Sequence, residues 1–204
     1  MPSNPEGLAM RLAADDVTRS LRASWRLLSA DAKALPDLDL SRDGFWRSYL
    51  ALVLTVPAII PVLAAERVLA GLPNTGRLFD APLLLASVIA AQLLAVITVP
   101  ALLVLLVPGL RQSPRFTGFI IAWNWASILS AGLIAVPAAV FALGWSHGGI
   151  AVIQALAFGT IILRLRYCVA RATFGAEARI AGAIACASLL ADYAIIRTFG
   201  LAGF

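Results

Sequence analysis

The stretch Phe116–Leu163, FTGFIIAWNWASILSAGLIAVPAAVFALGWSHGGIAVIQALAFGTIIL, carries no formal charge, and its one titratable side chain is His147. A bilayer core takes about 20 apolar residues per helical crossing, so this stretch is too long for one transmembrane helix and suits two. Between its halves lies Gly144-Trp145-Ser146-His147-Gly148-Gly149, which is rich in turn-forming residues. The sequence here predicts a helical hairpin in a membrane.

The composition of the whole chain extends this prediction. Hydrophobic residues make up 61% of the 204 residues and charged residues 13%, whereas soluble domains have about 45–50% apolar residues. Lipid cannot satisfy free backbone amides, so each crossing must be helical. We expect an all-α, polytopic membrane protein with a cytoplasmic arm (residues 1–44) and a membrane domain (residues 45–204).

Apolar runs of spanning length occur five times. We place the crossings at Phe45–Ala65, Pro82–Val107, Thr117–Leu143, Gly149–Ala170 and Ile180–Phe199. The fifth run is the least apolar because Asp192 lies inside it. An odd number of crossings puts the two ends of the membrane domain on opposite sides of the membrane.

The basic residues predict the orientation of these crossings. Thirteen fall on one side: Arg11, Arg19, Arg22, Arg26, Lys33, Arg42, Arg47, Arg111, Arg115, Arg164, Arg166, Arg171 and Arg179. Three fall on the other: Arg67, Arg77 and Arg197. Cytoplasmic connections carry the excess of Arg and Lys. We therefore expect the N-terminus in the cytoplasm and the C-terminus in the periplasm of a bacterial inner membrane. Arg164 and Arg166 are expected to extend to the cytoplasmic headgroups without partners in the core.

The arm contains a helical pattern over Asp16–Ala34, which Pro36 is expected to stop. Its larger apolar side chains recur at three- and four-residue spacing. The predicted apolar face comprises Val17, Leu21, Ser24, Trp25, Leu28, Ala32 and Leu35, and the separate basic stripe comprises Arg19, Arg22, Arg26 and Lys33. An amphipathic helix of this kind suits the plane of the headgroups. The alternative is that the apolar face packs on the protein's own spans or on a second subunit.

Asp192 is the acid that lies nearest the middle of a predicted crossing. Ionisable residues in membranes are costly and are candidates for function. The expected partners are Gln92, Gln154 and Arg197. One interpretation is a proton or cation relay. The others are a neutral carboxyl group that hydrogen-bonds to neighbouring helices, and a residue at the edge of a span whose true bounds are shifted.

A second polar set lies in the third crossing. Asn124, Ser127 and Ser130 share one helix face at three-residue spacing. Such residues form hydrogen bonds between membrane helices, and the alternative is a ligand site. Ser41 is expected to cap the first span.

Two further features concern the shape of the spans. Ala178, Gly182 and Cys186 form a row of small residues that permits close packing of the fifth crossing. Pro57, Pro100 and Pro137 lie within the first, second and third crossings, where the missing amide hydrogen predicts a kink in each.

Residues that carry catalysis or bind metals are scarce. The chain has one His and two Cys, and the sequence shows no acidic cluster, phosphate-binding glycine loop or convincing Ser-His-Asp set. We therefore expect no enzyme activity, no cofactor and no metal. The expected partners are membrane lipids and either another membrane protein or a second copy of this chain, and nucleic acid is not expected to bind.

The segment Phe119–Ser130, with Trp123-Asn124-Trp125 at its centre, resembles a stretch of bacterial YIP-like proteins. Leu38–Arg47 and the Tyr-Cys-Val-Ala-Arg-Ala sequence at 167–172 are also similar to those proteins. The resemblance covers about residues 38–199 and implies the five-pass plan of the YIP family, without catalytic residues. The vesicle-traffic role of eukaryotic members does not carry over to a bacterial chain.

Two functions follow from these features. The first is a non-enzymatic scaffold, assembly factor or accessory subunit that acts through helix packing and the cytoplasmic arm. The second is a small transporter or proton-coupled permease that uses Asp192 and Asn124.

Overall fold

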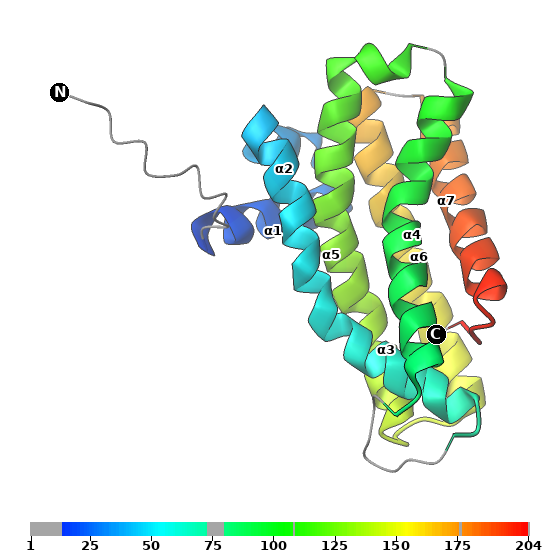
Figure 1. Ribbon diagram of the computed structural model, residues 1–204. Coiled ribbons are helices and arrows are strands. Elements are labelled where there is room, and N and C mark those ends of the chain that lie inside the picture. Colours follow the sequence, from blue (N-terminus) through cyan, green and yellow to red (C-terminus); the bar gives the residue numbers. More distant parts are fainter. Residues whose placement is uncertain (1–13, 73–79, 108, 176, 204) are drawn as a thin grey trace, which may run out of the picture.

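A computed structural model describes residues 14–72, 80–107, 109–175 and 177–203, and all regular structure in these ranges is helical. The helices, shown in Figure 1, follow in the order α1 (Ala14–Leu28), η1 (Ala32–Asp37), α2 (Arg42–Ala51), η2 (Leu52–Thr55), α3 (Val56–Leu69), α4 (Pro82–Leu106), η3 (Leu110–Gln112), α5 (Pro114–Ala142), α6 (Gly148–Phe174) and α7 (Ala178–Thr198). Of the arm, residues 1–13 lie outside the described residues.

Five helices are long and apolar enough to cross a membrane, as the sequence predicts. They are Arg42–Leu69, which joins α2, η2 and α3, and the single helices α4, α5, α6 and α7. The hairpin between α5 and α6 turns at Gly144, whose φ of 73° suits glycine. The five apolar helices fit an integral, multi-pass membrane protein.

The first span changes its helical winding ahead of Pro57. η2 (Leu52–Thr55) is a 3-10 helix, and the amide of Val56 bonds to the carbonyl of Val53. Pro57 has no amide hydrogen and its ring crowds the preceding turn, which disfavours regular α-helical winding there. The predicted irregularity is present at Pro57 as a tighter turn, whereas α4 and α5 continue as α-helices through Pro100 and Pro137.

The predicted helix Asp16–Ala34 is too long. α1 ends at Leu28, where Ala30 adopts a left-handed φ of 63° and the amide of Asp31 bonds to the carbonyl of Arg26. This is a Schellman C-cap, which ends a helix even without glycine. Pro36, expected to stop the helix, lies inside the separate 3-10 helix η1.

The face of α1 that packs on the protein also differs from the prediction. The side chains that α1 buries are Ser20, Ala23, Ser24 and Leu27. Trp25 is 54% exposed, whereas Val17, Leu21, Leu28 and Leu35 are only partly buried. Hydrophobic spacing selects the largest apolar side chains, but close packing on a neighbouring helix favours small ones. The arm nevertheless packs on the protein's own helices, since α1 contacts α5 and α6.

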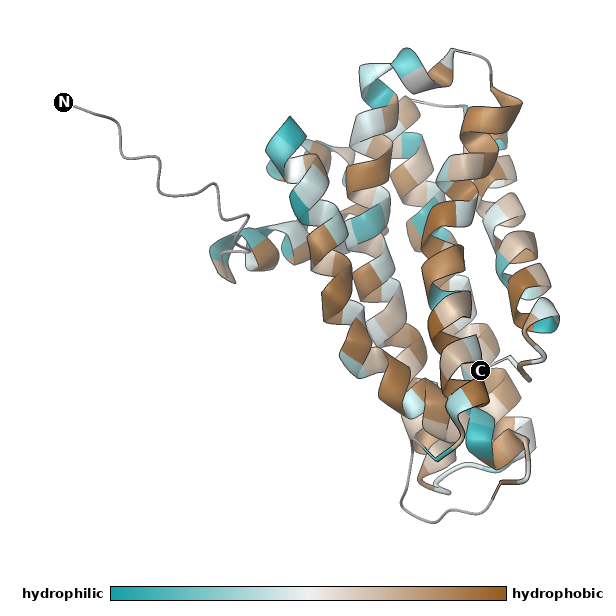
Figure 2. Cartoon of the chain, viewed as in Figure 1, coloured by the Kyte–Doolittle hydropathy of each residue, from teal (hydrophilic) through white to brown (hydrophobic). Residues whose placement is uncertain are grey.

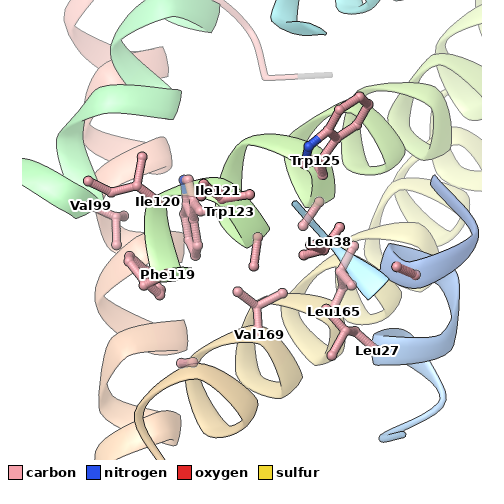
Figure 3. Packing of buried hydrophobic residues seen from close by; sticks show 14 of the residues in the cluster. Leu27, Leu38, Val99, Phe119, Ile120, Ile121, Trp123, Trp125, Leu165 and Val169 are labelled. Carbon is pink, nitrogen blue, oxygen red and sulfur yellow. The ribbon is translucent and has the colours of Figure 1, made fainter. Parts of the chain in front are cut away.

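α5 is the central helix of the bundle. It packs against α1, α2, α3, α4 and α6 and is the most buried of the five spans. Phe119, Ile121 and Trp123 are buried almost completely. Figure 3 shows these side chains beside Leu165 and Val169 of α6. A helix that is apolar on all sides is expected in such an interior position.

The bundle has two ends. We call the end with α1, η3 and the last turn of α6 the arm end, and the end with the last turn of α3, the 143–147 connection and Leu201 the tail end. Figure 2 shows hydrophobic residues along the spans between them. At the tail end, Leu201 packs with Leu63, Val88 and Ala91.

α7 packs through a row of small residues, but not the predicted one. Ala181, Ala185 and Ser188 are buried, whereas Ala178 and Cys186 are exposed. A Cβ added to Gly182 would meet no atom within 4 Å. The small residues that face the bundle therefore lie on a different side of α7 from the predicted row.

Candidate functional site

The strongest polar constellation joins α6 to α7 inside the bundle. The guanidinium group of Arg166 forms an ion pair with the carboxylate of Asp192 and donates a second hydrogen bond, of 3.2 Å, to the hydroxyl of Ser188. The side chains of Arg166 and Asp192 are 14% and 21% exposed. Arg is suited to this role because its planar group has several donors and stays charged.

An aromatic ring covers the same guanidinium group. The Cζ atom of Arg166 lies 5.4 Å from the centroid of the Trp123 ring, a cation–π geometry. Within the described residues, the Nε1 donor of Trp123 and the Oδ1 acceptor of Asp192 are buried without a hydrogen-bond partner. The constellation thus has one donor and one acceptor that the protein leaves unused.

The partner of Asp192 differs from the expected ones. Arg166 takes the place of Gln92, Gln154 and Arg197. The prediction that Arg166 has no partner in the core is therefore wrong. Arg164 is exposed, and its Nε atom donates to the carbonyl of Leu28 at 3.1 Å. Side chains on a helix lean toward its N-terminus, so Arg166 on α6 leans away from the arm end and into the bundle.

The two glutamines lie apart from this constellation. Gln92 lines a pocket of about 10 Å³ with Thr55 and residues of α3, α4 and α5, a volume that suits about one water molecule. The Oε1 atom of Gln154 is buried without a partner in the part of the chain that the structure describes.

Asn124 makes the predicted contact between helices, but its two serine neighbours do not. Its amide nitrogen donates to the hydroxyl of Ser48 at 3.0 Å, and that hydroxyl donates to the carbonyl of Phe45 at 2.7 Å. Ser127 and Ser130 bond to carbonyls of their own helix, at 2.8 and 2.9 Å. Because Asn124 and Ser48 are both buried, this bond fixes α2 against α5.

The sequence prediction missed a buried acid at the tail end. Glu66 is 3% exposed, and its two carboxylate oxygens accept hydrogen bonds from the backbone amides of Ala202 and Gly203 at 2.8 and 2.9 Å. Its neighbour Arg67 is also buried and pairs with Asp80. In the sequence, a Glu followed by an Arg at the end of an apolar run is typical of a helix end that faces water. The sequence therefore did not indicate that Glu66 is buried.

At the arm end, ion pairs join α1 to α2 and to η1. Asp16 pairs with Arg47 of α2 at 2.7 Å, and Arg26 pairs with Asp31 and Asp37. Ser41 caps α2 as predicted, accepting the amide of Gly44. Hydrogen bonds from Ser41 and the charge of Arg47 hold the pKa of Asp39 below its ordinary value. Within the described residues, Arg22 is exposed and makes no hydrogen bond or ion pair.

Comparison with models of protein families, with curated proteins and with solved structures finds no match. The resemblance to the YIP family therefore stays a prediction from residues 119–130 and the shorter stretches around them. No group of three His, Cys, Asp or Glu side chains in the described ranges is arranged to hold a metal ion.

Proposed function

We propose that this chain is a non-enzymatic scaffold, assembly factor or accessory subunit of a bacterial inner membrane, built on the five-pass plan of YIP-like proteins. The observation that carries the proposal is the use of the bundle's polar groups. Asn124 bonds to Ser48, Arg166 to Asp192, and Glu66 to the C-terminal backbone. These groups connect helices to one another, which is what a protein that works as a rigid body in an assembly requires.

The proposed orientation places the arm end in the cytoplasm. The basic side chains of the arm end, among them Arg115 and Arg171, support it through the positive-inside rule. Of the basic residues counted for this rule, Arg11 and Arg77 lie outside the described residues.

Reporter fusions test this orientation. Fusions after residue 175 are expected to report a cytoplasmic location, and fusions after residue 146 and at residue 204 a periplasmic one. A cytoplasmic reporter at residue 204 would contradict the orientation and the five-pass plan together.

The assembly role is tested by the mass of the protein in its native state. We expect chain extracted from its own membrane in mild detergent to show, by native mass spectrometry, a complex of fixed stoichiometry with another membrane protein or a second copy. The matched control is chain overproduced alone and purified in the same detergent. A single-chain mass from the native membrane at all concentrations would overturn the proposal.

A transporter or proton-coupled permease is the second candidate, and one observation favours it. Asp192 keeps a buried oxygen without a hydrogen-bond partner among the described residues, and such an oxygen could take up a proton. In proteoliposomes with an entrapped pH-sensitive dye, a permease would dissipate a pH gradient, and Asp192→Asn would fold normally but abolish the flux. Equal leak from empty vesicles, wild type and Asp192→Asn would remove this candidate.

A further inference from the structure

The position of α1 along the spans defines its depth in the membrane. Leu27 packs beside Leu165 in the buried cluster around α5 (Figure 3). Leu165 lies nine residues before the end of α6 at Phe174, which is about 14 Å along the helix at 1.5 Å per residue. At the other end of α1, Asp16 pairs with Arg47, five residues into the first span, or about 8 Å.

The lengths of the spans convert these positions into depths. α5 has 29 residues and α6 has 27, so they are about 43 and 40 Å long against a hydrocarbon core of about 30 Å. If the excess is shared between both ends, the core begins about 5–7 Å inside each end. α1 then lies from about 1 to about 9 Å below the boundary of the core, the depth at which interfacial helices lie. Figure 1 shows α1 running crosswise to the spans at this level.

The side chains of α1 form three sectors around the helix at 100° per residue. Ser20, Ala23, Ser24 and Leu27 face the protein. Next to them come the partly exposed apolar residues Val17, Leu28 and Leu21, followed by the exposed Trp25. The remaining sector is polar and holds Thr18, Arg22, Arg26 and Arg19. A helix that packed on the protein and otherwise faced water would not need the second sector.

We infer that α1 lies in the plane of the bilayer at the arm end, packed on α5 and α6 through its small residues, with Leu21 and Trp25 against lipid acyl chains and Arg22 at the lipid phosphates. Trp suits this boundary because its ring is apolar and its N–H is polar. Arg22 is suited to bind a phosphate because its guanidinium group has no partner within the described part of the chain. This lipid contact is independent of the assembly role proposed above.

Spin-label accessibility tests the inference in the full chain. The background is Cys168→Ala and Cys186→Ala, reconstituted in vesicles of phosphatidylcholine and phosphatidylglycerol, with a nitroxide at Leu21→Cys. The controls are labels at Leu190→Cys, a 68% exposed side chain of α7, and at Gln112→Cys, an exposed residue of η3. We expect the ratio of oxygen to nickel-chelate collisions at position 21 to approach that at position 190 and to exceed that at position 112 several-fold. A ratio equal to that at position 112 would overturn the inference.

A second measurement keeps the native cysteines. Vesicles of phosphatidylcholine with brominated acyl chains quench indole groups that contact lipid tails. Trp123 and Trp125 are buried, and the exposed Trp46 and Trp145 remain in both proteins, so the difference between the emission of the wild type and of Trp25→Phe reports on Trp25. We expect this difference to be much smaller in brominated than in unbrominated vesicles. A difference of equal size in both would place Trp25 in water and contradict the proposed depth.

Discussion

The arm-end half of the bundle is held by apolar packing, and the tail end depends on a few buried polar contacts. Among the described residues, twenty buried apolar side chains from six α-helices, η1 and the connection after it form one cluster around α5 toward the arm end, whereas four form the cluster at the tail end. The tail end instead buries Glu66 and Arg67. Apolar contacts depend on fit over a large area, and hydrogen-bonded charges depend on single atoms. The two halves should therefore respond differently to substitution.

α6 shows the same difference within one helix. Its buried residues concentrate near the arm end, at Leu165, Val169 and Ala170, while Ile153 and Leu156 near the tail end are exposed. Arg166 lies between Leu165 and Val169 along the chain, so its ion pair with Asp192 joins α7 to α6 within the buried region of α6.

Truncation of Trp123 should have the largest effect of the substitutions considered. Trp123 is 2% exposed and also covers the guanidinium group of Arg166. We expect Trp123→Ala to lower the free energy of unfolding by about 4 kcal/mol, as for other buried aromatic residues, and to lower the melting temperature in detergent strongly. The control is Trp145→Ala, because Trp145 is 76% exposed. Similar melting temperatures for both variants would contradict the idea of an apolar core at the arm end.

Loss of the Asp192 carboxylate should have the second-largest effect on the free energy of unfolding. Asp192→Leu leaves Arg166 without its ion pair and should cost about 3 kcal/mol, since a buried charge without a partner is costly. Asp192→Asn keeps a hydrogen-bond acceptor and should cost about 1 kcal/mol.

A double variant separates charge from packing at this site. Arg166→Met combined with Asp192→Leu removes both charges and should recover most of the melting temperature lost in Asp192→Leu. If the double variant melts below Asp192→Leu, then Arg166 contributes through its ring contact with Trp123 and not mainly through its charge.

At the tail end, Glu66→Ala should have an intermediate effect. It removes the acceptor of two backbone amides, which then lose their partner, at a cost of about 2 kcal/mol. We expect the amides of Ala202 and Gly203 to exchange hydrogen much faster in the variant. Glu177→Ala is the matched control, because the side chain of Glu177 is exposed and makes no capping bond. Unchanged exchange at both amides would show that Leu201 alone holds the tail.

The ion pair between the arm and the first span should have the smallest effect. Asp16 and Arg47 remain partly exposed, and such pairs contribute about 0–1 kcal/mol. A double-mutant cycle with Asp16→Ala and Arg47→Ala should give a coupling energy in that range, which falls with added salt. Leu27→Ala should cost more than either, because Leu27 is buried in the large cluster. A stronger effect of Arg47→Ala would mean that charge, and not packing, holds the arm.

The spans were predictable from the sequence because hydrophobic length is a local property. All five predicted crossings overlap the five long apolar helices, and the Gly144 turn and the Ser41 cap are where the sequence predicts them. Insertion in lipid demands helices of this length wherever the chain is apolar. The all-α class and the five-span plan follow from these local rules.

Which polar groups meet was decided only by the tertiary structure. Arg166 and Asp192 are 26 residues apart, Asn124 and Ser48 are 76 apart, and Glu66 and Ala202 are 136 apart. Their contact depends on how the helices rotate and slide against one another, which is set by the fit of small side chains such as Ala23 and Ala185. Helical periodicity shows which residues share a face, but it does not show which face meets which neighbour. That is why the sequence predicted a helix in the arm but left open whether lipid or the protein meets its apolar face, and only the structure shows Ser20, Ala23 and Leu27 against the bundle.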